Sequence, residues 1–172
     1  MQRQPDARVA VAFASAVWEL GYSMHPPSRH TYAHQPGWRP PRALCEARSA
    51  AFDWRVPTVD RDGLPVWQAA TIVVAISANP ARQHNWANAD GWLAETMHAA
   101  DLDDVLAEAE GRSTAALARL GHVARWSQRH DIADVIKRTL PSAHGVTYLG
   151  PRDGQGTWDP EWKVYDAYLP QR

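Results

Sequence analysis

The sequence contains very little cysteine, since Cys45 is the single cysteine among 172 residues. A lone cysteine cannot form a disulfide within the chain, and no companion spacing suggests a zinc site, so a reducing cytoplasm is the expected setting. Long hydrophobic runs are missing as well. The apolar stretch of residues 9–18 could mimic a signal peptide, but Asp6 as an N-cap and Gly21 as a stop favour a buried helix. It is too short to cross a bilayer, which takes about 20 residues, so we expect no membrane segment.

An excess of either charge is also lacking, because 18 Lys and Arg residues face 19 Asp and Glu residues, for a net charge of -1. A strong attraction of the whole molecule to nucleic acid is therefore not expected. The charges are nevertheless uneven: residues 63–110 carry one Arg against seven acids (-6), and residues 111–144 carry six Lys and Arg against two acids (+4). Such adjacent blocks indicate either neighbouring helices that neutralise each other or a polarised surface for a partner.

Motifs of catalysis and phosphate binding are absent: the sequence has no Gly-x-Ser-x-Gly, no Gly-x-x-x-x-Gly-Lys and no Gly-x-Gly-x-x-Gly. His30 and His34 are four residues apart, but Pro26, Pro27 and Pro36 disfavour the helix that would bring them together. A further acidic cluster is expected to cap a helix rather than to bind metal: Asp101, Asp103 and Asp104. We therefore expect that the protein is not an enzyme, that it has no catalytic residue, and that it binds no metal and no cofactor. A hydrolase or transferase of unknown type stays a minor alternative.

Hydrophobic periodicity predicts a single α+β domain over residues 1–172, with a small β-sheet, a helical second half and a C-terminal β-ribbon. The ribbon is predicted from two alternating runs, Val146 with Tyr148 and Trp162 with Val164, around a turn rich in Gly, Pro and Asp. Strands are expected at 31–33, 52–56 and 64–67, and helices at 9–18, 69–77, 89–98, 102–110, 114–128 and 132–140. The candidate N-caps of the last four helices are Asn88, Asp101, Ser113 and Asp131.

The helix of residues 114–128 offers the best candidate contact surface. An apolar stripe at helical spacing is expected to face the core and consists of Leu117, Leu120, Gly121 and Ala124. Trp126 lies nearly opposite this stripe, and arginines flank it on both sides: Arg112, Arg119, Arg125 and Arg129. Tryptophan and arginine are typical anchors of interfaces and can stack on nucleobases. The alternative is that Trp126 packs under the last helix or the C-terminal ribbon.

Three sequence elements together resemble a known family. They are Glu110-Gly111-Arg112, Arg119-Leu120-Gly121, and the ribbon running from Tyr148-Leu149-Gly150-Pro151-Arg152 to Trp162-Lys163-Val164-Tyr165-Asp166. In this order they resemble the C-terminal antitoxin domain of AbiEi-type proteins, over about residues 8–169. Arg152, in the ribbon motif, joins the weak candidates for contacts with a partner or nucleic acid.

The resemblance implies an antitoxin that counteracts a nucleotidyltransferase toxin in a bacterial type IV toxin-antitoxin or phage abortive-infection system, with or without direct contact. The metal-binding carboxylates would then belong to the toxin. Family members commonly carry an N-terminal winged-helix DNA-binding domain, whereas this chain begins directly in the antitoxin domain, so operator binding is not carried over. The competing hypothesis is a nucleic-acid-binding regulatory or accessory module that uses the basic block of residues 111–144.

Overall fold

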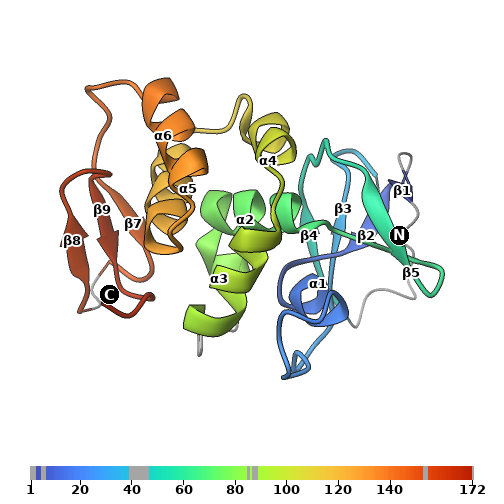
Figure 1. The fold of residues 1–172 in the computed structure, drawn as a ribbon. Coiled ribbons are helices and arrows are strands. Elements are labelled where there is room, and N and C mark those ends of the chain that lie inside the picture. Colours follow the sequence, from blue (N-terminus) through green and yellow to red (C-terminus); the bar gives the residue numbers. More distant parts are fainter. Residues whose placement is uncertain are drawn as a thin grey trace.

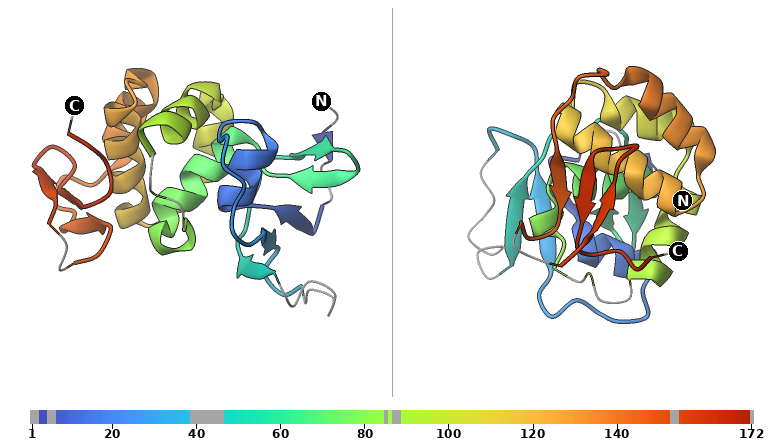
Figure 2. Two further views of the ribbon diagram at one scale, coloured as in Figure 1. Left: turned by 90° about the horizontal axis from the view of Figure 1, so that it is seen from below. Right: turned by 90° about the vertical axis from the view of Figure 1, so that its left-hand side faces the viewer.

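A layer of helices lies between two β-sheets in the computed structural model, with β1 and β8 at opposite ends of the molecule (Figures 1 and 2). The structure describes residues 3–4, 7–38, 47–84, 86, 89–152 and 155–171. The N-terminal sheet has the order β1-β5-β6-β2-β3-β4. Its strands are β1 (Arg3–Gln4), β2 (Val9–Val11), β3 (Thr31–His34), β4 (Arg48–Ala51), β5 (Thr58–Arg61) and β6 (Leu64–Val66).

The helices follow the first sheet, except for α1, which is inserted between β2 and β3. They are α1 (Phe13–Glu19), α2 (Ala69–Ala78), the short 3₁₀ helix η2 (Pro80–Arg82), α3 (Ala89–Ala99), α4 (Leu102–Ala109), α5 (Thr114–Trp126) and α6 (His130–Thr139). The C-terminal sheet has the order β7-β9-β8 and consists of β7 (Thr147–Leu149), β8 (Thr157–Asp159) and β9 (Val164–Asp166). The predicted α+β class with a helical second half is confirmed.

Helix α2 forms the centre of the core, as its almost unbroken apolar sequence predicts. Every residue from Ala69 to Ser77 is buried, and α2 packs against α1, α3, α4 and α5. The predicted stripe on α5 is also confirmed, because Leu120, Gly121 and Ala124 are buried and the half-buried Leu117 packs against the same core. These contacts fix α5 between α2 and the C-terminal sheet.

The prediction of one helix over residues 9–18 is wrong in its first part. Val9–Val11 form strand β2, which pairs with β3 and, through Val11, with Val66 of β6. A short apolar run fits a buried strand as well as a buried helix, and only the neighbouring strands decide between them. Gly21 follows the helix end as predicted, with φ of +81°. Asp6 lies outside the described residues.

The predicted strand at 52–56 is only an extended segment, although its alternation is correct: Phe52, Trp54 and Val56 are buried and Asp53 and Arg55 are exposed. The strands lie on either side of it, as β4 and β5. The backbone N–H groups of Arg55 and Val56 both donate to the Glu108 carboxylate at 2.9 Å, so this side chain takes the place of a neighbouring strand.

The C-terminal ribbon has three strands rather than the two predicted. β7 pairs with β9 in parallel, and β8, which the sequence pattern missed, pairs with β9 antiparallel. The phase of the first run is also reversed, because Thr147 and Leu149 are buried whereas Val146 is exposed. The prediction assumed a hairpin, in which the two strands are antiparallel. Because β7 and β9 are parallel, a hairpin turn cannot join them.

The C-terminal sheet packs on α5 where the Trp162 ring lies close to the backbone of Gly121. Trp162 is 1% exposed, and its ring lies against Gly121 so closely that a Cβ on this glycine would be 2.0 Å from Cζ3. Lys137 of α6 lies over the same indole, 4.7 Å from the ring centroid. Glycine at position 121 therefore allows the sheet to seat its largest side chain on the helix.

The helix caps agree with the sequence at two of the four expected positions. The Asp101 carboxylate accepts from the N–H groups of Asp103 and Asp104, and Ser113 Oγ accepts from Ala116 N–H. The prediction for Asp131 is wrong, because α6 begins at His130 with Arg129 at the N-cap position. Asn88 lies outside the described residues.

Candidate functional site

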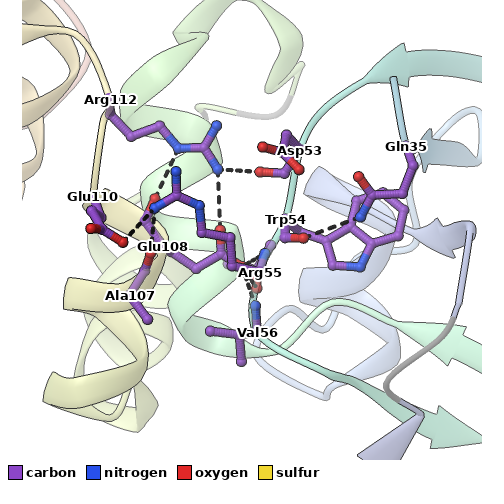
Figure 3. A network of polar contacts seen from close by, with 10 residues as sticks. Gln35, Asp53, Trp54, Arg55, Val56, Ala107, Glu108, Glu110 and Arg112 are labelled. Atoms are coloured by element: carbon purple, nitrogen blue, oxygen red, sulfur yellow. Dashed lines mark hydrogen bonds and ion pairs between the residues drawn. The ribbon is translucent and has the colours of Figure 1, made fainter. Parts of the chain in front are cut away.

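Arg112 holds the N-terminal sheet to the helical layer (Figure 3). Its guanidinium donates to the Glu108 carbonyl at 2.8 Å, to the Glu108 carboxylate at 3.2 Å and to the Asp53 carbonyl, and it lies 4.2 Å from the centre of the Phe52 ring. The fully buried Glu108 carboxylate also accepts from Thr71 Oγ1 at 2.9 Å. The guanidinium of Arg112 therefore donates to acceptors within the chain, which gives this predicted contact residue a structural role.

Arg119 binds carbonyl groups at the end of α2. Its guanidinium donates to Ser77 O at 2.6 Å and to Tyr148 O at 3.1 Å, and also reaches Ala78 O and Thr147 Oγ1. Burial lowers the pKa of Arg119 from its ordinary value. A cation at the C-terminal end of a helix satisfies free carbonyls and favours the helix dipole, and here the same group also fastens β7.

Arg129 does the same at the end of α3. It donates to Met97 O at 2.6 Å and Ala100 O at 2.8 Å, and it forms a two-pronged ion pair with Asp131 at 2.9 and 2.8 Å. The hydrogen bond from Arg129 lowers the pKa of Asp131 to about 2. Arg112, Arg119 and Arg129 of the basic block thus bind other parts of the chain, and two of them form ion pairs, Arg112 with Glu108 and Arg129 with Asp131.

Two of the predicted contact residues, Arg125 and Trp126, meet at a groove between the end of α5, β8 and the segment after β9. Its volume is about 530 Å³. Trp126 is half-buried and donates from Nε1 to Pro170 O at 3.0 Å, so it packs against the C-terminal segment, as the alternative interpretation held. Arg125 is exposed at the rim beside His130. Trp158, which sequence reasoning did not select, is 43% exposed on the β8 side of the groove.

His122 forms the floor of this groove and is clamped by two carboxylates. Its Nδ1 lies 2.7 Å from Asp159 Oδ2 and its Nε2 lies 2.7 Å from Asp166 Oδ2. Burial alone would lower the pKa of His122, but the hydrogen bonds and charges of the two aspartates outweigh it and raise this pKa to about 9. The imidazole is therefore doubly protonated at neutral pH, with both N–H groups donating.

The two aspartates also shape the turns beside the groove. Asp159 Oδ1 accepts from the N–H groups of Glu161 and Trp162, and Asp166 Oδ1 accepts from those of Tyr168 and Leu169. The hydrogen bond and charge of His122 outweigh burial and lower the pKa of Asp159. A sequence signal for this clamp was present in the aspartates that end both Trp158-Asp159 and Tyr165-Asp166.

The clamp rules out some chemistry. A protonated imidazole with both nitrogens occupied cannot accept a proton, so His122 is not a general base at neutral pH. Across the described residues, no group of three or more His, Cys, Asp or Glu side chains could hold a metal ion. His34 lies in β3 and His30 in the preceding loop, while Cys45 lies outside the described residues. The groove can therefore offer shape, two indoles and a cation to a partner.

Arg152 lies apart from this groove. It is exposed, its guanidinium is 5.4 Å from the centre of the Tyr148 ring, and it lines a separate hollow of about 510 Å³ beside β7. The six predicted contact residues are consequently spread over several faces. Within the described part of the chain, no helix is both long and apolar enough to span a membrane.

The comparisons agree with this fold. A crystal structure of the RV2827C protein from Mycobacterium tuberculosis superposes with a TM-score of 0.83 at 21% sequence identity, covering 95% of this chain and 64% of that one. This chain thus spans just under two thirds of that protein, and the likeness shows the fold alone. No curated protein matches.

The family model of the AbiEi antitoxin C-terminal domain matches residues 9–125. The match includes Glu110-Gly111-Arg112 and Arg119-Leu120-Gly121 but ends before the C-terminal ribbon, so the resemblance extends less far than the sequence motifs suggested. It still covers most of the chain, from β2 to the penultimate residue of α5. The chain belongs to the AbiEi antitoxin C-terminal domain family.

Proposed function

We propose that this chain counteracts a nucleotidyltransferase toxin in a type IV toxin-antitoxin or phage abortive-infection system of the bacterial cytoplasm. The observation that carries the proposal is the family match over residues 9–125, which supports a toxin-antitoxin role in general. The chain acts without catalysis, by contact with another macromolecule. Type IV antitoxins need no stable complex with their toxins, so a transient contact is sufficient.

The groove between α5 and β8 is the contact surface in this proposal. Trp158 and Arg125 are exposed there, and tryptophan and arginine are the residue types that most often anchor an interface. The clamp of His122 by Asp159 and Asp166 holds the two sides of the groove at fixed positions before a partner arrives. Such preorganisation reduces the entropy lost on binding.

Co-expression tests the antitoxin role directly. A candidate nucleotidyltransferase toxin is induced in a bacterial host, and growth is followed with and without the chain. We expect the wild type to relieve the growth arrest. Arrest that a well-expressed wild-type chain fails to relieve would remove the proposal.

A matched pair of variants tests the groove. Trp158→Ala combined with Arg125→Ala should weaken the relief of growth arrest, because it removes both exposed anchors without touching the clamp. Met24→Ala is the control, since Met24 is 94% exposed in the loop after α1 and lies outside the groove. Equal relief by the groove variant and the control, at equal protein levels, would show that toxin counteraction uses another surface.

The competing function, nucleic-acid binding by the basic block 111–144, has less support. Arg112, Arg119 and Arg129 already donate to carbonyl and carboxylate oxygens of the chain itself. Contacts with phosphates would have to replace these bonds, and leaving buried acceptors unpaired costs about 1–3 kcal/mol each. A regulatory role through this block would show as salt-dependent binding that Arg125→Gln and Arg138→Gln weaken.

A further inference from the structure

A further hollow, separate from the groove and from the hollow beside β7, gathers basic side chains from three separate segments. It has a volume of about 260 Å³. Arg29 comes from the loop after α1, Arg48 from the start of β4 and His84 from the segment after η2. Among the described residues that line it, none is acidic.

The cations at this hollow are available to a ligand, in contrast to Arg112, Arg119 and Arg129. In the described part of the chain, the guanidinium groups of Arg29 and Arg48 make no hydrogen bond or ion pair, and Arg82, beside His84, reaches only Ser49 O at 3.4 Å. Burial together with the charges of Arg48 and Arg82 lowers the pKa of His84. Positive charge is thus gathered here, and among the described residues that line the hollow no carboxylate offsets it.

The walls of the hollow are held in place by the fold. Arg48 pairs with Thr31 in the parallel β3-β4 ladder, and Thr31 N–H donates a hydrogen bond of 2.8 Å to the buried Ser15 hydroxyl oxygen. Pro26 and Pro27 stiffen the loop that carries Arg29. Arginine side chains on a rigid frame suit an oxyanion, which their planar donors can bind in pairs.

We propose that this hollow binds a phosphate group, using Arg29 and Arg48 as its main donors with His84 at its edge. The hollow is smaller than the roughly 300–1,000 Å³ of sites that enclose a whole small molecule, so it takes the phosphate and leaves the rest of the ligand outside. The phosphate belongs to a free nucleotide or to the backbone of a nucleic-acid strand. The site is independent of the antitoxin proposal and lies outside the basic block of residues 111–144.

Binding of two probes tests the site and separates the two sources. Fluorescence anisotropy of a labelled ten-nucleotide oligothymidylate is measured with the full chain at two salt concentrations, with adenosine monophosphate as competitor. We expect saturable binding that weakens with salt. Competition by the mononucleotide at concentrations that leave ionic strength unchanged identifies a nucleotide site, and binding of the oligonucleotide without such competition identifies a backbone site. Failure of both probes to bind would overturn the proposal.

Variants locate the site. Arg29→Gln with Arg48→Gln should weaken binding of the preferred probe by about tenfold or more, the usual effect of losing charge-assisted hydrogen bonds. For the oligonucleotide, the magnitude of the slope of log affinity against log salt should fall by about 0.7, the value for one phosphate contact on a single strand. The control is Arg125→Gln with Arg138→Gln, which removes the same two charges from exposed positions of α5 and α6. An equal loss in the control, or no loss in Arg29→Gln with Arg48→Gln, would overturn the proposal.

A local readout confirms the position. The imidazole signal that is missing from the NMR spectrum of His84→Gln is assigned to His84. The preferred probe should raise the pKa of this imidazole, because the negative charge of the bound phosphate offsets the charges of Arg48 and Arg82. Unchanged urea unfolding of Arg29→Gln with Arg48→Gln shows that the fold of this variant is intact. A bound probe that leaves the His84 titration unchanged would contradict binding in this hollow.

Discussion

Gly121→Ala provides the sharpest test of how the C-terminal sheet is seated on α5. The added Cβ would lie 2.0, 2.3 and 2.5 Å from Cζ3, Cη2 and Cε3 of Trp162. Carbon atoms pack at about 3.5–4.0 Å, so the ring would have to move by roughly 1.5–2 Å. Trp162 is buried under Lys137 and has no room to move without breaking its packing.

Two opposing effects set the magnitude. Alanine is favoured over glycine inside a helix by about 1 kcal/mol, whereas overpacking a core costs about 1–3 kcal/mol and sometimes more. Because the clash involves three ring atoms at once, overpacking should exceed propensity. We expect the free energy of unfolding to fall by about 1–2 kcal/mol, measured by urea denaturation followed by tryptophan fluorescence.

Two further variants complete the experiment. Gly91→Ala is the matched control, because Gly91 is an exposed residue of α3 whose added Cβ would meet nothing within 4 Å. It should leave stability unchanged or raise it by up to about 1 kcal/mol. In a Trp162→Leu background, Gly121→Ala should lose its penalty. The packing argument is refuted if Gly121→Ala is as stable as the wild type.

Two other predictions concern buried charges. The pKa of His122 is raised from 6.5 to about 9 on folding, so its contribution is complete below pH 6.5 and is lost as pH rises through 9. The stability advantage of the wild type over His122→Gln should thus shrink by about 3 kcal/mol between pH 6 and pH 10 in urea denaturation; a constant difference would contradict the clamp. Glu108→Gln should cost about 2–3 kcal/mol, because a buried carboxylate with several donors is lost. The side chain of Glu110 is 81% exposed, so Glu110→Gln should change stability by less than about 0.5 kcal/mol. If Glu108→Gln and Glu110→Gln lost equal stability in thermal denaturation, this would argue against the network of Figure 3.

The sequence predicts best where a local pattern has one physical solution. The apolar run of α2 is too long for a buried strand and becomes the core helix. Asp101 and Ser113 cap helices because their side chains reach N–H groups two or three residues away. In each case the interaction is complete within a few residues.

Prediction fails where the deciding partner is distant in the sequence. Val9–Val11 become a strand because β3 and β6 are available to pair with them. His122 is clamped by residues 37 and 44 positions away, which no local spacing indicates. The arginines of α5 look like a basic patch, but Arg119 donates to backbone carbonyls 41 and 42 positions away, and such acceptors leave no mark in the sequence.

The position of β9 has a consequence for how this chain folds during its synthesis on the ribosome. β9 is the middle strand of the C-terminal sheet, yet it is made after both of its neighbours. β7 and β8 therefore wait unpaired during synthesis until Val164–Asp166 emerge, and Asp166 then completes the ion pairs that hold His122. The N-terminal sheet and α2 can assemble well before that, so the last quarter of the chain is the final part to close.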